Sequence, residues 1–84
     1  MITIHKYPLI ITDTQIIECP AGAQPLSIKY QDHGWKLWAM VETENPPSDL
    51  TIVCVGTGQE VPNNIQEYID TVIDGTFVWH FFAI

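Results

Sequence analysis

The tetrapeptide Val55-Gly56-Thr57-Gly58 is the first place where this 84-residue sequence could do chemistry. It follows an apolar segment, as phosphate-binding loops do, because glycines allow backbone N–H groups to approach an anion closely. The next residues, Gln59-Glu60-Val61-Pro62, contain neither the Gly-Lys-Ser/Thr ending of a Walker loop nor the third glycine of a dinucleotide-binding turn. We therefore predict a tight turn or bulge. The alternative is that Gly56, Thr57 and Gly58 contact a small ligand through their backbone.

The other candidates for metal binding or nucleophilic catalysis are His5, His33, His80, Cys19 and Cys54. No two of them have a spacing typical of zinc ligands, so we expect no metal and no cofactor. A cysteine–histidine pair would also need an orienting group and an oxyanion donor, and the sequence identifies neither. We expect both cysteines to be buried small apolar side chains without a disulfide. A buried His80 must be hydrogen-bonded.

Acidic residues are concentrated between Glu42 and Asp49, in a segment that also contains Pro46-Pro47. The prolines exclude a helix and predict an exposed loop. Such a wet loop gives Glu42 and Glu44 no environment suited to a general acid or base, so acid–base catalysis is not supported and we expect the protein not to be an enzyme. Glu42, Glu44 and Asp49 are instead candidate contacts for a basic partner.

The charge balance excludes whole classes of partner. The chain has ten acidic residues and only three basic ones, Lys6, Lys29 and Lys36, which gives a net charge of −7. Binding to nucleic acid or to an anionic membrane draws on Lys and Arg, so both are excluded. No stretch is long and apolar enough for a membrane helix, and the first residues lack the apolar core of a signal peptide. We expect one domain, residues 1–84, in the cytoplasm.

Strand-like runs alternate with turn signals about every 12 residues, which predicts an all-β domain, a small antiparallel sandwich or barrel of six to seven short strands. Asp32-His33-Gly34 predicts a hairpin with His33 at its tip. Residues 50–55 form a continuous apolar run and predict a central strand. The expected inward-facing residues are Leu26, Ile28 and Tyr30 in one strand, and Trp35, Leu37, Ala39 and Val41 in the next.

Residues 64–73 are ambiguous between helix and strand. Ile65, Tyr68, Ile69 and Val72 have helical spacing, and Asn64 could cap a helix. The β-branched residues and the following Asp74-Gly75 turn favour a hairpin leading into residues 77–82. We predict the hairpin, with one helical turn possible near Asn63.

Aromatic residues make up 11% of the chain, more than a thin core can hide. In the last strand Phe77, Trp79 and Phe81 share one face, while Phe82 lies on the other. Either this strand is central in a sandwich, or its second face meets another copy of the chain, so we expect a homo-oligomer with these four residues at its interface. Trp38 faces away from the expected core and is a candidate interface or ligand-pocket residue.

Through several short motifs the sequence resembles a family of short uncharacterised phage and prophage proteins. These motifs are His5-Lys6-Tyr7-Pro8-Leu9, Thr12-Asp13-x-Gln15, Pro20-Ala21-Gly22-Ala23, Leu37-Trp38-Ala39, Val55-Gly56-Thr57-Gly58, Tyr68-Ile69-x-Thr71-Val72 and Phe77-Val78-Trp79-His80. Asp70 stands where we associate a glycine with this family, a departure that bears on the local backbone path. The resemblance implies no activity, only a context: a phage accessory gene expressed in a bacterial cytoplasm.

Three functions follow. The first is a phage counter-defence protein that occupies a basic surface of a host immune protein through Glu42, Glu44 and Asp49. The second is a homo-oligomeric sponge that sequesters a nucleotide signal, with Trp38 stacking on the base and Gly56, Thr57 and Gly58 holding phosphates. The third is a virion or scaffold component.

Overall fold

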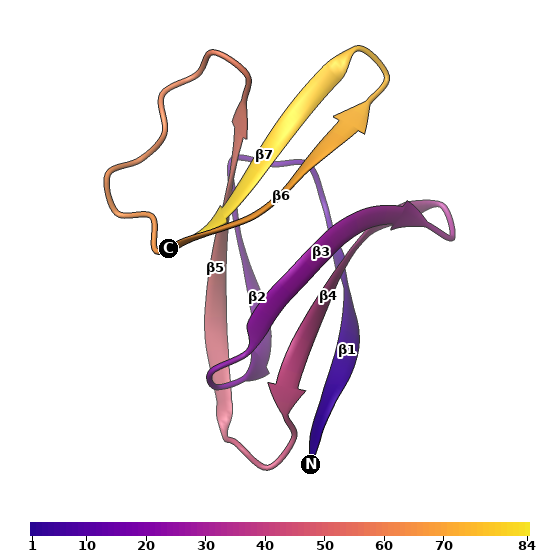
Figure 1. The fold of residues 1–84 in the computed structure, drawn as a ribbon, viewed down its shortest axis with the longest axis vertical. Helices are drawn as coiled ribbons and strands as arrows, with labels where there is room; N and C mark the ends of the chain where they lie inside the picture. Colours follow the sequence, from indigo (N-terminus) through magenta and orange to yellow (C-terminus); the bar gives the residue numbers. More distant parts are fainter.

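Seven strands and no helix make up the computed structural model, which describes residues 1–84 (Figure 1). The strands are β1 (Ile2–Leu9), β2 (Thr14–Pro20), β3 (Gln24–Gln31), β4 (Gly34–Glu42), β5 (Pro47–Gly56), β6 (Glu67–Asp74) and β7 (Phe77–Ala83). They form two antiparallel sheets that pack as an open sandwich, so the all-β prediction is confirmed in its sandwich form and not as a closed barrel. No helix in the structure is long and apolar enough to cross a membrane.

The smaller sheet has the strand order β1-β4-β3. In β4 the inward face is as predicted, because Leu37, Ala39 and Val41 are almost completely buried. β1 pairs with β4 as far as Leu9 even though it contains Pro8, which is opposite Lys36. Proline is tolerated there because β1 is an edge strand and one side of its backbone needs no ladder partner.

The prediction for β3 is wrong in one respect: only Ile28 of its three expected core residues is buried. A β-bulge between Pro25 and Ser27 displaces Leu26, which is 45% exposed. Tyr30 is 61% exposed and packs edge-on against Trp35 with ring centroids 5.3 Å apart. An extra residue in a bulge breaks the alternation of faces, which is why a strict period of two misplaces Leu26.

The larger sheet has the order β2-β5-β7-β6, so β5 and β7 are both central, as predicted for residues 50–55. Residues 67–74 form a strand that the two-residue loop Gly75-Thr76 joins to β7, which confirms the hairpin. The predicted Asp74-Gly75 turn is displaced by one residue, because Asp74 still pairs with Phe77. Asn63 and Asn64 form a turn, and no helical turn is present there. The register of β6 shifts between Tyr68 and Asp70, so a bulge lies beside Asp70.

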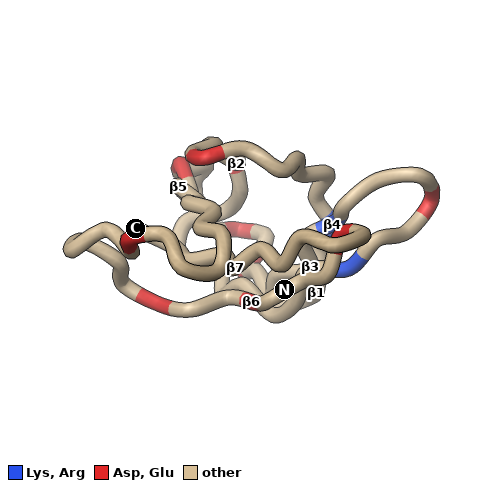
Figure 2. Tube along the Cα trace, turned by 90° about the horizontal axis from the view of Figure 1, so that it is seen from above, with Lys and Arg blue, Asp and Glu red and all other residues tan.

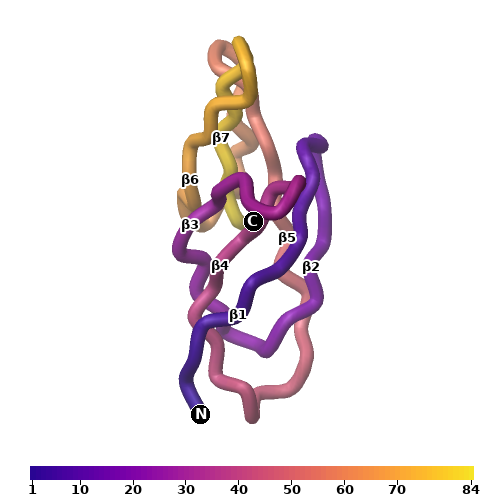
Figure 3. The backbone as a smooth tube through the Cα atoms, turned by 90° about the vertical axis from the view of Figure 1, so that its right-hand side faces the viewer, coloured from indigo at the N-terminus to yellow at the C-terminus, as the bar shows by residue number.

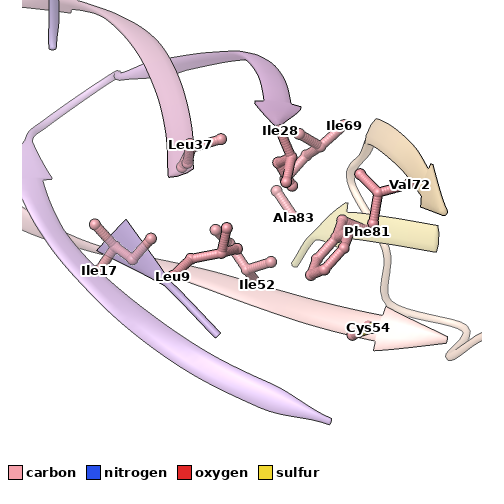
Figure 4. Close-up of a cluster of buried hydrophobic side chains, with 10 residues drawn as sticks. All are labelled: Leu9, Ile17, Ile28, Leu37, Ile52, Cys54, Ile69, Val72, Phe81 and Ala83. Carbon is pink, nitrogen blue, oxygen red and sulfur yellow. The ribbon is translucent and has the colours of Figure 1, made fainter. Parts of the chain in front are cut away.

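The core lies between the two sheets and is drawn in Figure 4. Leu37 and Ile28 enter it from the smaller sheet, and Ile52 and Phe81 from the larger one; all four are fully buried. Cys54 joins this cluster, and Cys19 is also buried, so the predicted burial of the two free thiols is confirmed.

The sheets also meet along one edge, where β3 and β6 lie side by side (Figure 3). The carboxylate of Asp70 bridges them: its Oδ2 accepts hydrogen bonds from the Ile28 amide at 2.7 Å and from Lys29 Nζ at 3.1 Å. At this edge of the smaller sheet the Ile28 amide therefore donates to a side chain and not to a neighbouring strand.

Candidate functional site

The Gly56-Thr57-Gly58 segment is a tight turn at the end of β5, as predicted. The Gln59 amide donates to the Gly56 carbonyl at 3.0 Å, and Gly58 has a φ of +89°, which side-chain-bearing residues rarely adopt. Gly56 has a crowded position: a Cβ there would lie 3.1 Å from Oε1 of Gln59 and 3.3 Å from Cζ3 of Trp79, so these side chains would have to shift slightly.

Thr57 ends a chain of four hydrogen-bonded side chains that runs across the larger sheet. Its Oγ1 lies 2.8 Å from Nε2 of His80, and His80 Nδ1 lies 3.0 Å from Oγ1 of Thr71. Thr71 Oγ1 in turn lies 2.7 Å from the hydroxyl of Tyr68. Both ring nitrogens of the half-buried His80 therefore have partners, as the sequence required of a buried histidine.

The chain forms because antiparallel pairing places its members together. Thr71 is directly opposite His80 in the β6–β7 ladder, and Val55 is opposite His80 in the β5–β7 ladder, two residues before Thr57. Thr57, Thr71 and His80 belong to three of the short motifs named above, and the pairing of the strands brings these motifs together. Sequence reasoning missed the contact because the partners are 23 and 9 residues apart in the chain.

Two cavities open beside the turn. One, of about 280 Å³, is lined by Thr57 and His80 together with the apolar side chains of Val55, Val61 and Phe82. The other, of about 420 Å³, lies against Phe77 and Trp79. Thr57 borders both cavities.

Trp38 does not share these cavities. It lies in β4 of the smaller sheet, opposite Lys6 on one side and Ser27 on the other, on the face that points away from the core. Within one chain the structure therefore does not assemble the predicted pocket of Trp38 with Gly56, Thr57 and Gly58. The two halves of that prediction belong to different sheets, which a strand pattern cannot reveal.

The aromatic residues of β7 lie on two faces. Phe81 is fully buried in the core, so its predicted place at an oligomer interface is wrong. Trp79 and Phe82 are half-buried on opposite faces of the strand, and Phe77 is 60% exposed and stacks on Trp79 with ring centroids 5.6 Å apart. The indole Nε1 of Trp79 is buried without a hydrogen-bond partner. The homo-oligomer stays a prediction.

The three predicted acidic contacts have different surroundings. Glu42 Oε1 accepts a hydrogen bond from the N-terminal ammonium at 2.6 Å, which, with a further bond from the Glu44 amide, lowers the pKa of this carboxyl. Glu44 is exposed in the turn between β4 and β5. Asp49 is exposed on the outer face of β5, directly opposite Glu18 of β2, a residue that sequence reasoning missed.

Neither Glu18 nor Asp49 takes part in an ion pair; the ion pairs of the chain are Met1–Glu42, Lys6–Asp32 and Lys29–Asp70. No three His, Cys, Asp or Glu side chains lie together as metal ligands would. The cysteine thiols are weak nucleophiles, because burial and the nearby Asp13 carboxylate raise the pKa of Cys54 to about 11.

Comparison with known proteins gives one match. Residues 1–84 match the family described as Domain of unknown function (DUF7352). No curated protein matches the chain, and no solved structure matches it.

Proposed function

The chain belongs to the family Domain of unknown function (DUF7352), and we propose that it acts as a binding protein whose acidic surface occupies a basic surface of another protein. The acidic patch consists of Glu18, Asp49 and Glu44. It lies on β2, on β5 and in the turn before β5.

The observation that carries the proposal is the direct opposition of Glu18 and Asp49. Like charges opposite one another in an antiparallel pair destabilise a sheet, and no cation of the chain compensates them. A partner that places Lys or Arg between the two carboxylates removes this repulsion, so the repulsion favours the bound state.

The distribution of cations supports the same proposal. Lys6, Lys29 and Lys36 all lie in the smaller sheet, on the face that also carries Trp38. In Figure 2 the lysine positions are confined to the neighbourhood of β1, β3 and β4, whereas acidic positions occur around the whole molecule. The acidic patch on β2 and β5 therefore keeps its negative field and can steer a basic partner toward it.

An apolar contact lies next to these charges. Ile16 is two residues before Glu18 on the same outer face of β2 and is 62% exposed. This exposed aliphatic side chain offers a partner an apolar contact beside the charges. Glu42 is not included in the patch, because the N-terminal ammonium already neutralises it.

The biological context of the proposal rests on the resemblance to phage and prophage proteins. In that context the partner is an immune protein of the bacterial host, and the chain is a counter-defence protein that works in the host cytoplasm. A protein with a strongly negative surface suits this role where the target uses a basic surface to bind nucleic acid.

The experiment compares two single charge reversals that change the net charge equally, Glu18→Lys and Glu60→Lys. Glu60 is exposed in the loop between β5 and β6 and lines a pocket with Asp13 and Thr14, at the start of β2 and four residues before Glu18 in that strand. Each variant is expressed in bacteria that carry one of a panel of defence systems. Phage plating is measured, and proteins that co-purify with the tagged variant are identified by mass spectrometry.

We expect the wild type and Glu60→Lys to restore plating against one system and to retain one of its proteins, and Glu18→Lys to lose both effects. Equal performance of the two variants would remove the acidic patch from the mechanism. Failure of the wild type against every system would remove the counter-defence role.

A further inference from the structure

We propose that Thr57 and His80 form a nucleophile–base pair that hydrolyses small esters with a short apolar acyl group. This activity goes beyond the binding function proposed above and does not rest on it, since the two sites share no residue. It departs from the expectation drawn from the sequence, where no orienting group for a histidine base could be identified.

The two side chains are close enough for the imidazole to accept the hydroxyl proton. The separation of 2.8 Å between Thr57 Oγ1 and His80 Nε2 is a hydrogen bond of ordinary length, short enough for proton transfer. Serine and threonine hydroxyls become effective nucleophiles when a neighbouring base accepts their proton in this way. The turn between Gly56 and Gly58 holds the hydroxyl at the mouth of a cavity.

The second ring nitrogen of His80 has the orienting partner that such a base needs. Its Nδ1 lies 3.0 Å from Thr71 Oγ1, which lies 2.7 Å from the Tyr68 hydroxyl. When Nδ1–H donates to Thr71 and Thr71 donates to Tyr68, Nε2 is left as the acceptor for the Thr57 proton. Thr71 and Tyr68 are thus positioning residues, and the Tyr68 side chain, 57% exposed, connects the chain to water.

Donors for a developing oxyanion are present in the same turn. The backbone amides of Thr57 and Gly58 make no hydrogen bond within the protein, in contrast to the amides of Gly56 and Gln59. The amide of the residue after the nucleophile is a frequent oxyanion donor in hydrolases. These two N–H groups are therefore available as donors to an oxyanion.

The neighbouring cavity limits the substrate. Its volume of about 280 Å³ and its apolar lining of Val55, Val61 and Phe82 suit a short hydrocarbon chain. No lysine or arginine borders it, so it offers no charged group to recognise a carboxylate or phosphate. We therefore assign neutral esters with acyl groups of a few carbons as the substrate class.

The reaction has two balanced halves. Thr57 Oγ1 attacks the ester carbonyl carbon while its proton moves to His80 Nε2; the ester C–O bond then breaks and His80 returns that proton to the departing alcohol. In the second half water attacks the acyl-Thr57 carbonyl and gives a proton to His80. The bond from the acyl carbon to Thr57 Oγ1 breaks, His80 returns the proton to Thr57, and the carboxylic acid leaves.

The test measures hydrolysis of p-nitrophenyl butyrate by the purified full chain and three variants, with circular dichroism to verify folding. We expect Thr57→Val, which keeps the shape and removes the hydroxyl, to lower the rate at least tenfold. Thr57→Ser should retain the rate. The matched control is His33→Asn at the exposed hairpin tip, which should leave the rate unchanged although it removes an imidazole that could react by itself.

The positioning role of Thr71 has its own readout. Thr71→Val should lower the rate, and Thr71→Ser, which restores the hydroxyl, should recover it. A fluorophosphonate probe should label the wild type once, with loss of fluoride and formation of an O–P bond at Thr57, as located by peptide mass spectrometry. A folded Thr57→Val variant with wild-type hydrolysis, or a label at another residue, would overturn the proposal.

Discussion

The Oδ2 atom of Asp70 in β6 accepts a hydrogen bond from the Ile28 amide in β3 at 2.7 Å, and this bond ties the edge of one sheet to the edge of the other. The same oxygen lies 3.1 Å from Lys29 Nζ, and Oδ1 accepts from the Thr71 amide at 2.8 Å. A single carboxylate therefore joins the two sheets and also holds the backbone beside Thr71, a member of the His80 chain.

Removal of this carboxylate should loosen the sandwich. We expect Asp70→Ala to lower the free energy of unfolding by about 2 kcal/mol, since the amide of the fully buried Ile28 loses its partner. Urea denaturation followed by tryptophan fluorescence measures the change. Asp74→Ala, which removes an exposed carboxylate from the same strand, is the control and should cost little. Equal effects of the two variants would show that the bridge does not contribute to stability.

The Asp70 carboxylate should also make stability depend on pH. Partial burial acts to raise its pKa, but the bonds from the Ile28 amide, Lys29 and the Thr71 amide outweigh burial, so the pKa lies below the ordinary value of 3.8. The unfolded chain then binds the proton at higher pH than the folded chain does. The stabilisation is present above the ordinary value and is lost as the pH falls through the folded-state pKa.

Asp70→Asn isolates this contribution from that of the other acids. The stability difference between the wild type and Asp70→Asn should be largest near neutral pH and should shrink in strong acid. Urea titrations across that range measure it. A difference that stays constant with pH would mean that the Asp70 pKa is not lowered by folding.

Local patterns in the sequence were sufficient for most of the fold. The alternation of Leu37, Ala39 and Val41 identified the core face of β4. The Asp74-Gly75 signal identified the last hairpin, although its loop is Gly75-Thr76. Local patterns failed where the pairing register of two strands decides which side chains are buried, as at the bulge that exposes Leu26. A bulge depends on how one strand pairs with another, and a single strand's alternation does not contain that information.

The candidate sites were less predictable than the fold. Glu18 faces Asp49, and Thr57 contacts His80, only because distant strands pair in one particular register. Each residue taken alone is an ordinary exposed acid or turn residue. The bridge from Asp70 to Ile28 likewise joins residues 42 positions apart, so no local pattern revealed it.

The opposition of Glu18 and Asp49 predicts that Glu18→Lys stabilises the isolated chain. The change replaces a repulsive cross-strand pair by an attractive one, and we expect a gain of about 0.5 kcal/mol in the free energy of unfolding. The gain should disappear at high salt, because exposed charges are screened. Urea denaturation at low and high salt measures both effects. A loss of stability would contradict the assigned register of β2 and β5.

The two free thiols should react only when the domain opens. Burial, together with Asp13, raises the pKa of Cys54 to about 11, and burial, together with Asp49, raises the pKa of Cys19. We expect Ellman's reagent to find no reactive thiol in the folded protein at mildly alkaline pH and both thiols after denaturation in guanidinium chloride. A rapidly reacting thiol in the folded protein would contradict the burial of the cysteines.

The hairpin between β3 and β4 carries side chains at two positions of positive φ. Its two loop residues, Asp32 and His33, have φ values of +54° and +65°, a conformation that suits Asn-Gly far better than side chains such as histidine. We expect the double change Asp32→Asn and His33→Gly to raise the free energy of unfolding by about 0.5–1 kcal/mol. The exposed Lys6–Asp32 contact at 3.9 Å is lost, but such surface pairs contribute little. His33→Ala is the control, because it keeps a Cβ at positive φ and should give no gain. Thermal unfolding of the three proteins distinguishes relief of backbone strain from a general tolerance of the hairpin tip to substitution.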